Sequence, residues 1–267
     1  MKIFSLVSIL SLSILVGCGG GGESSSAVPA NSGSVDGQGG SMARFSIIGD
    51  YLYTISGTDL QLYNLATDPA KPSKYARIPV GWDIETLYSA NNYLFIGAST
   101  GVYIFDNNDP SNPFQISKFL HVQSCDPVVV SGQYAYVTLR GGGRCGQGGS
   151  RMEVLDLTDI KNPLLVKSYV MQNPKGLGVQ DNMLFVCDDV AGLKVFNLAD
   201  PLNPQLGIDD VSINCFDLIP YKNNLVVNDN NSGNLVISDK TGILQYQYDP
   251  VGLTKVSSII QNSSAVK

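Results

Sequence analysis

After residue 41, short apolar and aromatic segments alternate with turns, and one order of segments recurs five times. Each repeat has an apolar segment, a tight turn, an aromatic-rich segment, and a third segment in which apolar and polar residues alternate. Such alternation is typical of β-strands, and no stretch of about 10–15 residues shows the 3.6-residue period of a helix. The pattern therefore predicts an all-β domain.

The second segment is the clearest marker of each repeat. These segments begin at Tyr51, Tyr93, Tyr134, Met183 and Leu225, which gives repeat lengths of 42, 41, 49 and 42 residues. Gly, Asn or Asp residues come just before them, and these residues tolerate the positive φ angles of hairpin turns. Each second segment is therefore predicted to be the second strand of a hairpin.

A proline-containing turn follows the third segment of the first four repeats. The third segments run 60–65, 102–106, 152–157, 193–198 and 235–239, and the turns begin at Asp68, Asp109, Asp159 and Asp200. The fifth repeat has Asp239-Lys240-Thr241-Gly242 in place of such a turn. Proline cannot donate to a ladder, so the turn is predicted to end the third strand and lead into an outer fourth strand.

Four short strands in each repeat of about 40–45 residues indicate the blades of a β-propeller. We expect five four-stranded blades over residues 42–267. A closed ring is favoured over a linear array, because closure removes most exposed strand edges. The segment Lys255–Ile260 resembles a first strand, and it is either a truncated sixth inner strand or a strand that pairs near Arg44–Ile48.

The repeat resembles that of a known family. The pattern G-x-Y-A-Y-V … G-L-x-I-x-D-[VL]-[ST]-[DN]-P-x-x-P, best matched over 131–163 and 181–204, is similar to the LVIVD repeat of bacterial cell-surface proteins. The resemblance covers about residues 42–253. It implies β-propeller blades, a location outside the cytoplasm, and a role in binding or assembly.

The N-terminus is predicted to be a targeting segment. Lys2 precedes an apolar run over 3–16, which is short for a membrane span and suits a signal peptide. The run ends in Leu15-Val16-Gly17-Cys18, which resembles a lipobox. We expect residues 1–17 to be removed, Cys18 to be acylated, and the Gly/Ser-rich residues 18–41 to be a flexible tether. These features predict an envelope protein held by lipid in the membrane, at the outer membrane or cell surface.

Composition excludes several functions. The formal net charge is −6, from 17 basic and 23 acidic residues without basic clusters, which argues against a nucleic-acid partner. A single histidine excludes sites built from several histidines. The Gly-rich loop over 141–149 lacks the G-x-x-x-x-G-K-[ST] pattern of a phosphate-binding loop, so it is interpreted as a long recognition loop.

The propeller register gathers polar residues on one face, where the loops before first strands meet the loops between second and third strands. Glu85, two residues after Asp83, and Asp189, next to Asp188, are expected on the same face. The candidate binding face comprises Trp82, Asp83, Asp126, Arg140, Arg144, Asp188 and Asp217. Trp82 is open to two interpretations, sugar stacking or core packing.

Four cysteines fall on the same face after Cys18 is assigned to lipidation. An even number in an oxidising compartment predicts disulfides. The expected pairs are Cys125–Cys145 and Cys187–Cys215. The spacings of zinc ribbons are missing, so a thiolate metal site is disfavoured.

These observations predict non-catalytic binding or assembly at the cell surface, with an envelope protein or a glycan as partner. No catalytic residue is assigned. The alternative is a glycosidase-like envelope enzyme that uses two of the carboxylates. The same carboxylates raise the further option of a calcium site, because oxygen ligands suit that cation.

Overall fold

The computed structural model describes residues 40–121, 124, 127–142, 145–146, 148–221, 224–230, 241–249 and 252–260. These residues belong to one unit of the chain, Ser34–Lys267. They form twenty β-strands in five antiparallel sheets of four strands each. In this part of the chain we find no helix with the length and apolar character needed to cross a membrane. The all-β prediction is confirmed.

The first three sheets share one order, in which consecutive strands of the chain lie side by side. Sheet 1 contains β1 (Phe45–Ile48), β2 (Tyr51–Ser56), β3 (Asp59–Asn64) and β4 (Ser73–Pro79). Sheet 2 contains β5 (Ile84–Ala90), β6 (Tyr93–Ala98), β7 (Gly101–Asp106) and β8 (Phe114–Leu120). Sheet 3 contains β9 (Val128–Ser131), β10 (Tyr134–Leu139), β11 (Arg151–Asp156) and β12 (Leu164–Val170).

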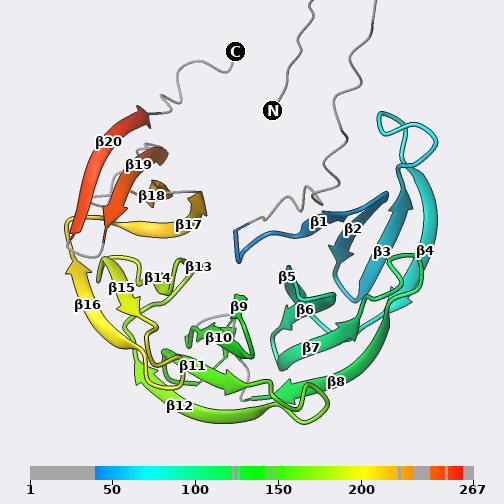
Figure 1. Ribbon diagram of the computed structural model, residues 1–267, viewed down its shortest axis with the longest axis horizontal. Helices are drawn as coiled ribbons and strands as arrows, with labels where there is room; N and C mark the ends of the chain where they lie inside the picture. Colours follow the sequence, from blue (N-terminus) through cyan, green and yellow to red (C-terminus); the bar gives the residue numbers. More distant parts are fainter. Residues whose placement is uncertain are drawn as a thin grey trace, which may run out of the picture. The chain divides into compact units, whose positions relative to one another are not determined.

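The last two sheets follow the same order. Sheet 4 contains β13 (Leu177–Gln180), β14 (Met183–Cys187), β15 (Leu193–Asn197) and β16 (Gln205–Asp210). Sheet 5 contains β17 (Cys215–Tyr221), β18 (Asn224–Asn230), β19 (Thr241–Asp249) and β20 (Gly252–Ile260). The sheets succeed one another in chain order, and the first strands of consecutive sheets are in contact (Figure 1). This arrangement is consistent with a propeller-like fold.

The turns between first and second strands have the predicted backbone. Asn91 and Asn92 have φ angles of 51° and 61°, and Asp181 and Asn182 have 51° and 58°. Residues with short polar side chains accept this left-handed region at low cost, and such turns match the twist of the strands they join. The hairpin prediction is confirmed at these positions.

The fifth repeat differs from the prediction in its second half. Its third strand is β19 and not the segment 235–239, which lies outside the described residues. Lys255–Ile260 belongs to β20, so both earlier options for this segment were wrong: it is the fourth strand of sheet 5 and pairs with β19. Sheet 5 still carries the register shift between third and fourth strands, at Gln245/Tyr246, that the other four sheets show. A shared backbone irregularity therefore identifies the repeat where the proline turn is missing.

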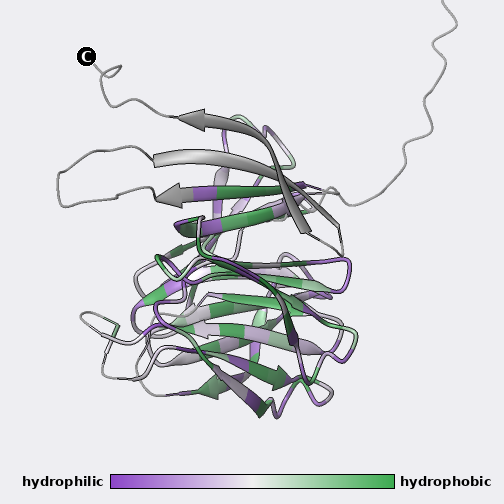
Figure 2. Ribbon diagram, turned by 90° about the vertical axis from the view of Figure 1, so that its left-hand side faces the viewer, coloured by the Kyte–Doolittle hydropathy of each residue, from purple (hydrophilic) through white to green (hydrophobic). Residues whose placement is uncertain are grey.

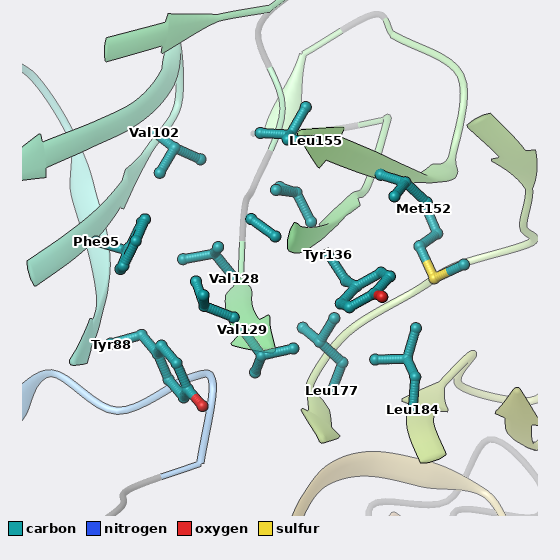
Figure 3. Close-up of a cluster of buried hydrophobic side chains, with 14 of the residues drawn as sticks. Tyr88, Phe95, Val102, Val128, Val129, Tyr136, Met152, Leu155, Leu177 and Leu184 are labelled. Carbon is teal, nitrogen blue, oxygen red and sulfur yellow. The ribbon is translucent and has the colours of Figure 1, made fainter. Parts of the chain in front are cut away.

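Buried side chains fill the space between adjacent sheets. In the largest cluster, Phe95 of sheet 2 and Leu184 of sheet 4 lie on either side of residues of sheet 3 such as Val129 and Tyr136 (Figure 3). Apolar residues concentrate in the strands and polar residues in many of the turns (Figure 2). Fourth strands are mostly exposed, whereas second strands are mostly buried. Packing between sheets is thus the main source of burial, as expected from alternating strands.

The aspartate that begins each proline turn has a structural role. Its side chain accepts a hydrogen bond from the backbone N–H two residues later, as in Ala70 N to Asp68 Oδ1 (3.0 Å) and Ser111 N to Asp109 Oδ1 (3.0 Å). The same bond forms at Asp159 and Asp200. Such local bonds favour a turn over continued strand.

The proline turn also joins neighbouring sheets, a role that the sequence did not suggest. The hydroxyl of Tyr53 in sheet 1 donates to the carbonyl of Pro110 in the turn of sheet 2 (2.7 Å). Tyr136 in sheet 3 donates in the same way to Pro201 of sheet 4 (3.1 Å). Sheet 2 has Phe95 at this position, and there Ser117 of β8 donates to Ile160 of the next turn (2.6 Å). Among the described residues, a hydroxyl from one sheet therefore binds the carbonyl just after the turn's aspartate in the next sheet three times.

The residues before β1 lie against three other sheets. The backbone N–H of Leu177 in β13 donates to Ser41 Oγ (2.7 Å), and that of Leu87 in β5 donates to the carbonyl of Ala43 (2.8 Å). A Cβ on Gly40 would lie 3.0 Å from Asp217 Oδ2 in β17. Residues 40–43, the central segment, thus connect sheets 2, 4 and 5.

Candidate functional site

A pocket of about 310 Å³ brings together residues from four sheets. They come from the residues before β1, β9 and β13, from the start of β5, and from the loops after β2 and β10. Its charged side chains, which we call the charged pocket, are Arg44, Asp83, Glu85, Arg140 and Lys175. The sequence predicted that the loops before first strands lie on the same face as the loops after second strands. Asp83 and Arg140, one from each kind of loop, do line the same pocket.

Backbone geometry fixes Asp83 at the start of β5. Its φ is 55°, in the left-handed region that aspartate tolerates better than most residues. The carbonyl of Asp83 accepts from Ser99 N (3.1 Å), and the N–H of the next residue, Ile84, donates to Gly57 O (3.0 Å). The loop thus turns sharply between two fixed points and leaves Asp83 on the pocket wall.

Arg140 is held by its neighbours at the end of β10. Ser124 Oγ donates to the Arg140 carbonyl (2.9 Å), and Arg140 Nε and Nη2 donate to Cys145 Sγ (3.3 and 3.1 Å). Two of its donors are therefore engaged beside the 141–149 loop. A guanidinium has five N–H donors, so others remain to meet a ligand.

Lys175 reaches the pocket from the loop before β13. Its Nζ lies 3.0 Å from Asp189 Oδ2 and 4.8 Å from the centre of the Phe216 ring. Its carbonyl accepts from Thr138 Oγ1 of sheet 3 (2.7 Å). Because Asp189 partly neutralises Lys175, the two arginines are the main source of positive charge in the pocket.

The surroundings of Glu85 in the pocket shift the pKa of its carboxyl group. Burial raises the pKa of the Glu85 carboxyl, and the nearby Asp83 raises it further, while Arg140 and Arg44 oppose the shift. Two carboxyl groups and two guanidinium groups therefore interact in a partly desolvated space. Such a set of groups is typical of sites that bind polar ligands.

Trp82, next to Asp83, does not pack in the core. It is 80% exposed, so the core-packing interpretation of this residue was wrong. An exposed indole beside a charged pocket leaves the stacking interpretation open. Asp126 and Arg144, also predicted on this face, lie outside the described residues.

Asp188 is in a different environment from the one predicted. Its side chain is 0% exposed and accepts from the backbone N–H groups of Gln172 (3.0 Å) and Asn173 (2.7 Å). Burial raises its pKa, and these two donors oppose that shift. Asp188 lines a groove of about 790 Å³ between β12 and the strands β15 and β16, together with Tyr169 and Lys194. It therefore organises a loop and does not contribute to the charged pocket.

Asp217 is also apart from the charged pocket. Its Oδ1 is buried with no hydrogen-bond partner in the described structure, and Gly176 of the neighbouring sheet lies so close that a Cβ there would collide with it. Burial raises the pKa of Asp217 to about 6, opposed by the backbone N–H of Leu218. Its position at the central segment indicates a role in packing and not in ligand binding.

The Cys187–Cys215 disulfide is confirmed. It joins the end of β14 to the start of β17, with the two Cα atoms 4.8 Å apart, and so ties sheet 4 to sheet 5. Cys125 and Cys18 lie outside the described residues, so the Cys125–Cys145 pair and the lipidation of Cys18 stay predictions.

No group of three or more His, Cys, Asp or Glu side chains is arranged to hold a metal ion among the residues that the structure describes. The calcium option is therefore not supported by a ligand set in this part of the chain.

Arg44 and Lys175 were missed from the sequence, although a usable signal was present. Both precede a first strand, as Asp83 does, so the register that selected Asp83 also points to them. The sequence search looked for carboxylates at this position and overlooked the cations. The sequence contains no signal for Gly57 and Pro127, which also line the pocket and carry no charged side chain.

Comparison with known proteins adds information on the fold alone. No protein-family model matches the sequence, and no curated protein matches it. Among solved structures, a putative 6-phosphogluconolactonase from Bacteroides uniformis ATCC 8492 has 14% identity and a TM-score of 0.60, over 79% of this chain and 68% of that one. A functionally unknown protein from Desulfotomaculum acetoxidans DSM 771 has 14% identity and a TM-score of 0.56, over 80% and 72%. The computationally designed Ika8 protein has 12% identity and a TM-score of 0.55, and this chain spans 60% of its length.

Proposed function

We propose that this chain is a lipid-anchored protein of the bacterial cell envelope, whose five sheets are the blades of an LVIVD-type β-propeller. Its charged pocket binds a ligand without catalysis. The observation that carries the proposal is the convergence of Arg44, Asp83, Glu85, Arg140 and Lys175 from four sheets on one pocket. Residues that are distant in the chain gather there, as in the ligand sites of other folds.

The chemistry of the charged pocket favours an acidic sugar. Guanidinium groups of Arg44 and Arg140 suit a carboxylate or phosphate, and the carboxylates of Asp83 and Glu85 suit sugar hydroxyls. The volume of about 310 Å³ fits a small polar group more readily than a long chain. Trp82 beside it offers an exposed ring on which a sugar can stack.

Calorimetry on the full chain, purified in detergent, tests this proposal. The ligands are short oligosaccharides with uronic acid units and their neutral counterparts. We expect acidic oligosaccharides to bind more tightly than neutral ones, and Arg44→Gln to weaken that binding by about tenfold. Arg77→Gln is the matched control, because Arg77 pairs with Asp59 on sheet 1 and does not line the pocket. Equal binding of acidic and neutral sugars, or none of either, contradicts the proposal.

One observation favours a second candidate, a glycosidase-like enzyme. Glu85 has a raised pKa and lies two residues from Asp83 in the same pocket, as an acid and an ionised partner would. Release of reducing ends from the same oligosaccharides, abolished by Glu85→Gln, would support hydrolysis in place of simple binding. We expect binding without release.

A further inference from the structure

The groove that Asp188 lines between sheets 3 and 4 is a second candidate site. Its volume of about 790 Å³ is more than twice that of the charged pocket, which is about 310 Å³, and the two cavities share no lining residue among those described. Residues 167 and 169–172 of sheet 3 form one wall, and residues of β15 and 203–206 of sheet 4 form the other. β12 and β16 are the outer strands of their sheets (Figure 1), so the groove runs along the outer strands and apart from the charged pocket.

The groove is long and has strand edges beside it. Its wall on sheet 3 extends from Lys167 to Gln172, which is about 16 Å at the rise of an extended chain. In the described structure, β12 pairs only with β11 and β16 pairs only with β15, so each outer strand keeps an edge of backbone N–H and C=O groups without a strand partner. An extended peptide can hydrogen-bond to such an edge. The length of the groove therefore suits about five residues of extended chain.

Aromatic and apolar side chains line much of the groove. The Tyr169 ring packs edge-to-face on Phe196, with the ring centroids 5.7 Å apart, and its hydroxyl donates to the Pro204 carbonyl (2.9 Å). These two contacts fix the ring in place. Val170 and Leu206 also line the groove, and they are 94% and 51% exposed. Exposed apolar side chains along a groove indicate a surface that a ligand covers.

Lys167 supplies the positive charge of the groove. Its Nζ donates to Asn203 Oδ1 and lies 5.2 Å from the centre of the Tyr169 ring, and no carboxylate pairs with it among the described residues. Two of the three N–H donors of its ammonium group therefore remain for a ligand. Lys194, the other lysine of the groove, differs because its Nζ lies 2.7 Å from Asp209 Oδ1. The end of the groove at Lys167 is thus complementary to an acidic group.

The neighbouring interface, between sheets 2 and 3, shows that the repeat does not require these lysines. By strand register, Lys167 takes the position of Ser117, and Lys194 takes the position of Glu153. Ser117 is 9% exposed and donates to a turn carbonyl of sheet 3, and Glu153 is 2% exposed and pairs with Arg151 (2.6 Å). Both positions are buried and have partners within the protein at that interface. Between sheets 3 and 4, the same positions line an open groove and include a lysine without an acidic partner.

We propose that this groove binds an extended segment of another protein, about five residues long, in which apolar residues flank one acidic residue. The acidic side chain pairs with Lys167. The apolar side chains pack on Tyr169, Val170 and Leu206, and the backbone hydrogen-bonds to the free edge of an outer strand. An acidic sugar or a fatty acid could also meet the lysine, but a peptide is the ligand that also supplies the backbone groups with which a strand edge pairs.

Selection of a phage-displayed library of random hexapeptides on the full chain in detergent tests the proposal. We expect the enriched peptides to share one acidic residue between apolar residues. The most enriched peptide is then synthesised with blocked ends and a fluorophore, and its affinity is measured by fluorescence anisotropy. Lys167→Gln is expected to weaken binding by about tenfold. Lys118→Gln is the matched control and is expected to bind as wild type does, because Lys118 lies on β8 and does not line the groove.

Charge reversal separates a lost contact from a misfolded variant. Lys167→Glu is expected to prefer the same peptide with lysine in place of its acidic residue, a gain that misfolding cannot produce. Arg44→Gln is expected to leave peptide binding unchanged, so failure here and failure of the charged pocket are told apart. The proposal is overturned if no peptide is enriched, if the enriched peptides lack the acidic residue, or if Lys167→Gln binds as tightly as wild type. Binding of a uronic acid oligosaccharide or a fatty acid that depends on Lys167, without peptide binding, also overturns it and assigns the groove to that ligand.

Discussion

Single residues in this protein show how burial and charge are balanced against each other. The carboxyl group of Asp217 lies between the central segment, which is close to Oδ2, and Gly176, which is close to Oδ1, and Oδ1 has no hydrogen-bond partner among the described residues. Burial raises its pKa to about 6, so the folded protein keeps this proton to a higher pH than the unfolded chain does. Since the unfolded chain titrates at 3.8, the folded state binds more protons between these values.

This carboxyl makes stability depend on pH. Its favourable contribution is complete below pH 3.8 and is lost as the pH rises through about 6. We expect Asp217→Asn to gain stability relative to wild type between pH 4 and pH 7.5, by up to roughly 3 kcal/mol. Urea unfolding of both proteins at the two pH values measures this. A constant difference between variant and wild type would mean that Asp217 does not titrate in this range.

At the scale of strands and turns, hydroxyl groups link consecutive sheets. Tyr136→Phe removes the bond to the Pro201 carbonyl and leaves that carbonyl without this donor. We expect a loss of about 1 kcal/mol in the free energy of unfolding. Tyr134→Phe is the control, because Tyr134 lies on the same strand and its hydroxyl has no partner among the described residues. Equal losses in the two variants would assign the effect to the ring and not to the bond.

The Cys187–Cys215 disulfide acts at the same scale, because it ties β14 to β17 across a sequence separation of 28 residues. Replacing both cysteines by alanine is expected to cost about 3 kcal/mol, mainly because the unfolded chain regains freedom. Chemical unfolding of the oxidised proteins measures the difference. A double variant as stable as wild type would show that sheet packing alone holds these two strands together.

The sequence predicted most of these elements, because alternation and turn residues are local signals. It placed the second strands of all five repeats correctly, and also the hairpin turns before the first four of them. It misplaced the end of the fifth repeat, where no proline turn marks the boundary. The bond from Tyr53 to Pro110 was out of reach, since it joins residues 57 positions apart and neither one is unusual in its own segment.

At the scale of the whole molecule, the site was predicted only in part. Asp83 and Arg140 were placed on one face and do line one pocket, because both follow from the repeat register. Asp188 and Asp217 take other positions in the register, those of Leu139 and Thr86, and their carboxyl groups are buried. Burial of a polar residue depends on which loops pack over it, and a repeat pattern carries no information about that.

Attachment to the membrane is the remaining prediction at this scale, and it depends on Cys18. An acyl chain contributes about 0.8 kcal/mol for each methylene buried in the bilayer, so several chains hold the protein firmly. We expect the wild-type chain, expressed in a bacterium, to incorporate a clickable palmitate analogue and to fractionate with membranes. Cys18→Ser is expected to lose the label, because the thiol is the acceptor. The variant without Cys187 and Cys215 is the control and is expected to keep it. Label that persists in Cys18→Ser would place acylation elsewhere, and an unlabelled wild-type chain would mean that residues 1–17 are an ordinary secretory signal.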